Sequence, residues 1–91
     1  MTVGVSHDLD TGDVVLVVKA EKAIYDFAPD RARAVAAELR AAASAGGAVL
    51  IVATADDGRQ IRLGGDAASA LVMAADIERN ASLGQAIKTS E

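Results

Sequence analysis

Two short runs of consecutive aliphatic residues constrain the fold of this chain more than any other feature. The first run is Val14–Val18, and the second covers residues 48–53, within a predicted strand at residues 48–54. Each run has the length of a strand and is far too short to span a membrane. A strand that is apolar at every position is typical of a sheet interior covered on both faces. The sequence therefore predicts two central strands.

The same order of elements follows both runs. A turn and a second strand (Ala23–Phe27) follow the first run, and a turn and a strand at residues 59–63 follow the second. Apolar residues at spacings of three and four then predict a helix in each half. We interpret the halves, at about residues 13–45 and 48–80, as a duplicated β-β-α unit. Their identity is low, so chance convergence of two amphipathic units is the alternative.

Local signals mark the ends of both predicted helices. Pro29 suits the first helical position, because its missing N–H would be unbonded there in any case. Gly46 and Gly47 are expected to end that helix in a left-handed conformation. The second helix is expected from about Asp66 to residue 79. Its apolar residues cover most of the circumference, which is typical of a helix that touches more than one surface.

An additional strand is predicted at the N-terminus, where residues 2–7 alternate in the manner of a half-buried edge strand. The predicted fold class is α+β, with two helices packed on one mixed, mainly antiparallel five-stranded sheet. A right-handed crossover would make Ala23–Phe27 parallel to residues 48–54. Residues 1–80 are expected to form one domain. Residues 81–91 would either extend the second helix or form a flexible tail.

Composition narrows the classes of function. The chain has 9 Lys and Arg against 13 Asp and Glu, a net charge of −4. Nucleic-acid binding is therefore not expected, although Arg31, Arg33 and Arg40 share one predicted helix. The absence of Cys excludes thiolate chemistry and disulfides. The N-terminal segment has no basic region followed by an apolar stretch, so we expect a cytoplasmic protein without membrane association.

One polar cluster is a candidate metal site. His7, Asp8, Asp10 and Asp13 could supply ligands to a hard cation, but their spacing departs from that of a calcium-binding loop. Asp and Gly are also common in hairpin turns, because Asp bonds to nearby backbone N–H groups and Gly adopts positive φ. We favour this interpretation as a turn. The serines show no evident nucleophile–base arrangement in the sequence. We therefore predict no catalytic residue, no metal and no cofactor, and interpret the chain as a non-enzyme.

Residues 25–43, with the sequence YDFAPDRARAVAAELRAAA, resemble a passage in small uncharacterised proteins of high-GC actinobacteria and their phages. In that passage a strand leads to a Ser/Thr-Pro-acid helix start and an Ala-rich helix. Here Ala28 stands at the position of the capping Ser or Thr, so one cap is lost. The resemblance covers about a fifth of the 91 residues. It implies a phage or mobile-element accessory protein, but no activity and no functional residues.

The apolar content suggests a partner. Ala supplies much of the 52% hydrophobic fraction and buries little area, so a second subunit is expected to add stability. We expect a non-enzymatic, self-associating interaction module that forms a homodimer or a larger assembly, with an unidentified protein as a further partner. The candidate interface is either the sheet face around Val15, Val17, Val49 and Ile51 or the second helix at Val72 and Met73. The alternative is a small-molecule or protein-binding regulatory domain of permuted ferredoxin-like type.

Overall fold

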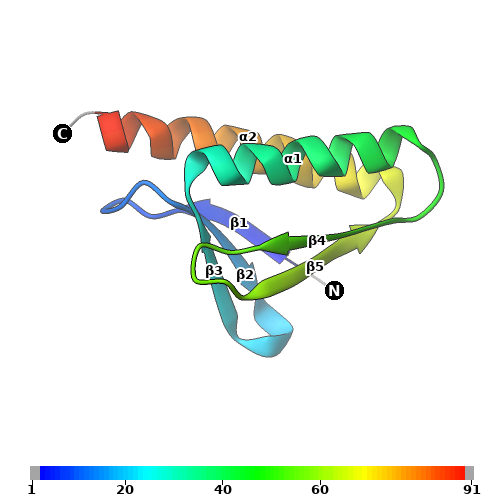
Figure 1. The fold of residues 1–91 in the computed structure, drawn as a ribbon, viewed down its shortest axis with the longest axis horizontal. Coiled ribbons are helices and arrows are strands. Elements are labelled where there is room, and N and C mark those ends of the chain that lie inside the picture. Colours follow the sequence, from blue (N-terminus) through cyan, green and yellow to red (C-terminus); the bar gives the residue numbers. More distant parts are fainter. Residues whose placement is uncertain (1–2, 90–91) are drawn as a thin grey trace.

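The computed structural model describes residues 3–89 as one layer of two helices on one layer of strands (Figure 1). The elements in chain order are β1 (Val3–His7), β2 (Val14–Val18), the 3-10 turn η1 (Lys19–Glu21), β3 (Ala23–Phe27), α1 (Pro29–Ser44), β4 (Val49–Thr54), β5 (Gln60–Gly65) and α2 (Ala67–Thr89). The predicted α+β class is confirmed. Thr2 of the predicted first strand, and Ser90 and Glu91 of the predicted extension, lie outside the described residues.

The strands form two sheets, so the prediction of a single five-stranded sheet is wrong. One sheet has the order β1-β2-β3, the other consists of β4 and β5, and all three strand pairs are antiparallel. The expected parallel pairing of β3 with β4 is replaced by two contacts. The backbone N–H of Asp56 donates to the carbonyl of Asp26 at 2.9 Å, and the guanidinium of Arg59 donates to the carbonyl of Ile24 at 2.6 Å.

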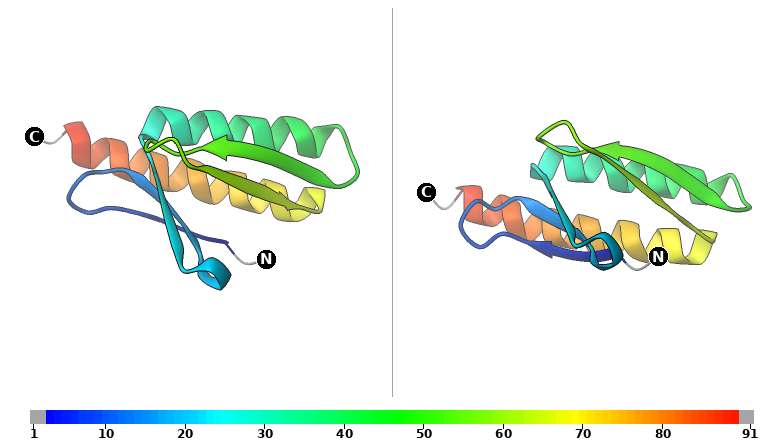
Figure 2. Two further views of the ribbon diagram at one scale, coloured as in Figure 1. Left: turned by 60° about the horizontal axis from the view of Figure 1, so that its bottom comes forward. Right: turned by 90° about the horizontal axis from the view of Figure 1, so that it is seen from below.

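These two contacts explain why the sheets separate. The carbonyls on the outer edge of β3 accept hydrogen bonds from the turn between β4 and β5, the second hairpin of the chain. These carbonyls are therefore not paired with β4, and β4 does not lie alongside β3. From this point the β4–β5 hairpin diverges from the three-stranded sheet. β4 follows α1, β5 crosses toward the start of α2, and β1 lies beneath α2 (Figure 2). Arg59 is held further by Asp57, at 2.6 Å, and its guanidinium lies 4.6 Å from the ring centroid of Tyr25.

Both helices cover the same side of the strands, and no element within residues 3–89 covers the other side (Figure 1). Coverage of that side by a second subunit stays a prediction. On β2, Leu16 is 1% exposed and faces the helices, whereas Val17 lies on the opposite face and is half-buried. On β4, Val49 is 3% exposed, but Leu50 is 70% exposed. The side of the strands away from the helices therefore retains apolar side chains in contact with solvent.

The first helix begins and ends where the sequence predicts. Pro29 is its first residue, and Ala28 before it provides no side-chain capping hydrogen bond. Gly46 and Gly47 follow its C-terminus with φ values of +83° and +75°, a conformation that glycine adopts without a Cβ penalty. The Arg40 guanidinium on α1 donates to the Glu78 carboxylate on α2, with an Nε–Oε2 distance of 3.0 Å, and this pair links the two helices.

The second helix is longer than residues 66–79, because it continues to Thr89. Its buried side is formed by Ala70, Ala74, Ile77, Asn80, Ala81 and Gly84. Under the proposed duplication, Ala68, Leu71 and Ala75 would match the buried residues of α1, yet all three are exposed. The two halves therefore share the order of their elements but differ in which helix face packs inward.

The C-terminal half of α2 is fixed against the turn between β1 and β2. Gly84 and Gly12 approach so closely that a Cβ on Gly84 would overlap the carbonyl oxygen of Gly12. The Lys88 ammonium pairs with the Asp13 carboxylate in the same region, at 3.0 Å. This contact positions β1 beside α2, where the candidate site lies.

Candidate interaction groove between β1 and α2

The first strand is an edge strand with one side bonded to β2 and the other side free. Asp8 N–H donates to the carbonyl of Asp13 at 2.8 Å, which continues the β1–β2 register. Because bonded pairs alternate along an antiparallel ladder, Gly4 and Ser6 are then the β1 residues bonded to β2. The backbone N–H and C=O groups of residues 3, 5 and 7 point away from β2. Within residues 3–89 they have no recorded hydrogen-bond partner.

The same alternation on the opposite edge supports this assignment. If Gly4 and Ser6 bond to β2, the remaining β2 residues bond to β3, and the carbonyls of Ile24 and Asp26 must point away from β2. Those are the two carbonyls that accept from Arg59 and Asp56. One edge of the three-stranded sheet is therefore occupied by the second hairpin, and the edge at β1 is left free.

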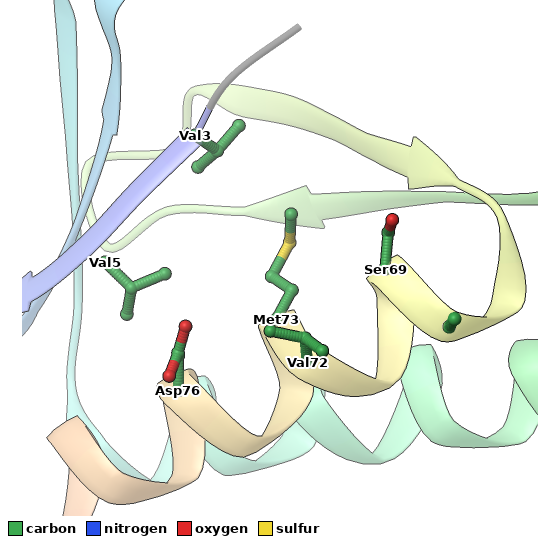
Figure 3. A pocket seen from close by; sticks show the side chains of 7 residues that line it. Val3, Val5, Ser69, Val72, Met73 and Asp76 are labelled. Atoms are coloured by element: carbon green, nitrogen blue, oxygen red, sulfur yellow. The ribbon is translucent and has the colours of Figure 1, made fainter.

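A groove of about 410 Å³ runs beside this free edge. It is lined by Val3 and Val5 on β1 and by Ala68, Ser69, Val72, Met73 and Asp76 on α2. Figure 3 shows the two β1 valines on one side and the α2 side chains on the other. A second hollow of about 270 Å³ shares Val3 and Met73 and extends toward β4 and β5. The lining is mainly apolar, as in surfaces that bind proteins or apolar ligands.

Val72 is the most exposed large apolar residue of the groove, at 64% of its side-chain and backbone surface. Leu71 beside it is 41% exposed. A helix in a monomer normally turns such residues toward the core. On α2, the core-facing positions are filled instead by alanine, glycine, Ile77 and Asn80. These small residues let α1 and β1 approach closely and leave larger side chains on the outside.

A polar pair joins β1 to α2 next to Asp76, a residue of the groove lining. Asn80 is 7% exposed, and its Nδ2 donates to the carbonyl of Asp76 at 2.9 Å. This bond assigns Oδ1 as the atom facing His7 Nδ1, at 2.8 Å. Because Oδ1 can only accept, the network places the His7 proton on Nδ1. The Asp76 carboxylate is paired with Arg79 at 2.7 Å.

Sequence reasoning missed Asn80. Its only signal was a position three residues after Ile77 on the buried side of the helix, where an amide is unusual. Such a residue needs a partner for its amide, and His7, at a separation of 73 residues, supplies it. Nothing near Asn80 in the sequence indicates that partner.

The structure does not bring the predicted interface residues together. Val15 and Val17 lie on the side of β2 away from the helices, whereas Val49 is buried and Ile51 half-buried on the helix-facing side of β4. Val72 and Met73, the other predicted set, both line the groove. That either set forms an interface stays a prediction.

The apolar residues on the far side of the strands are a second exposed surface. Ile24 on β3 is 55% exposed, and Leu50 and Val52 on β4 are 70% and 49% exposed. These residues are divided between two diverging hairpins (Figure 2). The groove combines its apolar lining with a free strand edge, and we therefore consider it the stronger candidate.

The residues of the suspected cation site have separate partners. The Asp8 carboxylate accepts from the backbone N–H groups of Thr11 and Asp10, at 3.1 and 2.7 Å, and these bonds lower its pKa. Asp13 pairs with Lys88, and His7 with Asn80. Within residues 3–89 no three His, Asp or Glu side chains are grouped as metal ligands. The arrangement has the form of a hairpin turn stabilised by its own Asp side chain.

The arginines of α1 each contact an acidic side chain. Arg31 lies 3.4 Å from Asp56 and Arg33 lies 3.3 Å from Asp30, while Arg40 pairs with Glu78. A surface that binds phosphates needs basic side chains in excess of nearby acids. This helix face has as many acidic partners as arginines.

No protein-family model matches the chain, and no curated protein or solved structure is similar to it. No helix within residues 3–89 combines the length and the hydrophobicity that crossing a bilayer requires.

Proposed function

We propose that the protein is a non-enzymatic, self-associating interaction module whose contact surface is the groove between β1 and α2. The observation that carries the proposal is the free edge of β1 next to exposed apolar side chains of α2. Monomeric proteins usually protect strand edges with charges, proline or a covering segment, and they rarely leave an apolar groove beside such an edge. A protein partner would cover both features at once.

The polar side chains of the groove support a role without catalysis. Among the described residues, Ser69 is the hydroxyl residue of the groove lining, and its backbone N–H donates to the Asp66 carboxylate at 2.7 Å. Hydrogen bonding by Ser69 lowers the pKa of Asp66, so this carboxylate is a weak base and serves as the cap of α2. A nucleophile needs a base that can accept its proton. Ser69 and Asp66 are thus assigned to helix capping.

Binding of a small apolar molecule is a second candidate function, and the size of the groove favours it. A volume of about 410 Å³ falls within the usual range of ligand sites, about 300–1,000 Å³. This candidate keeps the small-molecule-binding role of the permuted ferredoxin-like alternative, with two sheets in place of the single sheet expected from the sequence. A ligand of this kind would raise the melting temperature of the protein, because it binds only the folded state. An apolar probe that raises the melting temperature and leaves the mass unchanged would favour this role over self-association.

Light scattering over a wide concentration range tests the main proposal. The wild type should reach the mass of a dimer as the concentration rises. Val72→Glu places a charge in the groove and should shift association to higher concentration. Val52→Glu makes the same change at an exposed valine on the far side of β4 and should leave association unchanged. A wild type that stays monomeric, or a dimer lost only in Val52→Glu, would contradict the proposal.

We also propose the biological origin and the cellular location of the protein. The resemblance of residues 25–43 supports a phage or mobile-element accessory protein, and the composition supports a cytoplasmic location. Neither the proposed origin nor the proposed location depends on the groove.

A further inference from the structure

We propose that the partner of the free edge is β1 of a second copy, paired antiparallel about a two-fold axis at Val5. The two three-stranded sheets would then form one six-stranded sheet with both α2 helices on the same side. This inference rests on the proposed self-association and adds its geometry. Closed dimers with two-fold symmetry are the commonest form of self-association among soluble proteins.

The hydrogen-bonding groups of β1 are complementary to themselves. The free N–H and C=O groups belong to Val3, Val5 and His7, which are evenly spaced about Val5. When Val5 lies opposite the partner's Val5, these two residues form a bonded pair and exchange both hydrogen bonds. Val3 then lies opposite the partner's His7, and the reverse pair forms as well. All three free residues of each edge would be satisfied without any shift of β2.

The charges of β1 also favour a copy of itself. The strand VGVSH has no Lys, Arg, Asp, Glu or Pro, so it lacks the residues that usually block edge pairing. Two such edges meet with no like charges directly opposite each other. A strongly charged peptide would find no opposite charge on this edge. Asp76 beside the edge is already paired with Arg79.

The arrangement of the elements leaves room for a second strand. In the right-hand view of Figure 2, β1 runs along the outer margin of the molecule and α2 is set back from that margin. The helix therefore does not cover the free edge from the side. The small residues Gly4 and Ser6 occupy the other face of β1, so no large side chain projects there.

A stable dimer must bury surface in the groove as well as along the β1 edge. A standard interface buries about 800 Å² on each partner. The accessible surface of this chain is 5207 Å², so such an interface would cover a substantial part of it. A five-residue edge is only about 17 Å long, and neighbouring strands lie about 4.8 Å apart. Strand pairing alone therefore covers too narrow a strip. The partner's strand and helix must also cover the groove lining, including Val72, which is 64% exposed.

A single introduced cysteine tests the register, because the chain has no cysteine of its own. In the proposed dimer the two Val5 Cα atoms lie about 5.5 Å apart, within the range of a disulfide. Val5→Cys should therefore form a covalent dimer under mild oxidation. Val3→Cys is the matched control, since its two copies lie four positions apart, or about 14 Å, beyond disulfide reach. Circular dichroism of the reduced variants checks that both are folded.

Three results would overturn the inference. Equal cross-linking of Val5→Cys and Val3→Cys would indicate random collision or another register. Absence of cross-linking in Val5→Cys, with a dimeric mass for the same reduced variant, would refute strand pairing but leave self-association intact. A monomeric mass for the wild type and the variants at all concentrations would refute both proposals. Selective cross-linking of Val5→Cys would support both.

Discussion

Replacing Gly84 with alanine should destabilise the protein, although alanine is the better helix former. Helix propensity alone would stabilise α2 by about 1 kcal/mol. The new Cβ would, however, overlap the backbone carbonyl of Gly12. A backbone atom cannot move aside as a flexible side chain can, so the turn between β1 and β2 must shift away from α2.

The loss of stability is the cost of overpacking minus the gain in helix propensity. Overpacking of a well-packed contact costs about 1–3 kcal/mol, and the shift also strains the Lys88–Asp13 pair at 3.0 Å. Because the overlap is with backbone atoms, the cost should lie in the upper part of that range, at about 2–3 kcal/mol. After about 1 kcal/mol is deducted for propensity, the net loss is about 1–2 kcal/mol. In a domain of this size each kcal/mol lowers the melting temperature by about 4–8 °C.

Thermal unfolding followed by circular dichroism, at one fixed protein concentration, measures the effect. Ser82→Ala is the control, because Ser82 is exposed on the same helix and alanine there should leave stability unchanged or slightly higher. A melting temperature of Gly84→Ala equal to or above that of the wild type would refute the close contact between Gly84 and Gly12.

Three further substitutions test the packing of the β4–β5 hairpin and the ion pair between the helices. Leu63→Ala should cost about 2–5 kcal/mol, because Leu63 is 0% exposed; Leu50→Ala on the other strand of the same hairpin should cost no more than about 0.5 kcal/mol, because Leu50 is 70% exposed. Similar costs in urea unfolding would show that the faces of this hairpin are misassigned. Hydrogen bonds from Arg40 lower the pKa of Glu78, so the pair stabilises the folded state above the pKa of an unfolded glutamate, about 4.3. Glu78→Gln should therefore lower stability slightly at pH 7, and the difference from wild type should shrink as the pH falls below that value; a difference independent of pH would contradict the ionic role.

Local features of the fold could be predicted from the sequence because their causes act within a few residues. Pro29 fixes the start of α1, and Gly46 and Gly47 adopt the left-handed conformation after its end. Gly58 occupies its turn with a φ of +92°, and Asp66 caps α2 through the N–H of Ser69 at 2.7 Å. Each of these residues has a conformational preference that does not depend on the rest of the chain.

The division into two sheets could not be predicted in the same way. Its cause is a set of contacts between segments distant in sequence, above all Arg59 with the carbonyl of Ile24 and the ring of Tyr25. The apolar pattern of residues 48–54 suits a strand in either arrangement, because β-branched residues favour strands whether or not both faces are covered. The pattern identifies the strand but not its neighbour.

The groove, too, could be predicted only in part from the sequence. An excess of apolar residues on α2 indicated Val72 and Met73, and both line the groove. The opposite wall, Val3 and Val5, was predicted only as part of an edge strand. That β1 and α2 lie together follows from the glycine contact and from the pairing of His7 with Asn80, which join residues more than seventy positions apart.

Amide hydrogen exchange at Val5 tests the central claim of strand-edge association most directly. The N–H of Val5 has no recorded partner within residues 3–89, whereas Gly4 and Ser6 already bond to β2. Measured below and above the concentration at which the mass doubles, Val5 exchange should slow strongly on association, and Gly4 and Ser6 should change little. Unchanged exchange at Val5 while the mass doubles would place the interface elsewhere on the molecule.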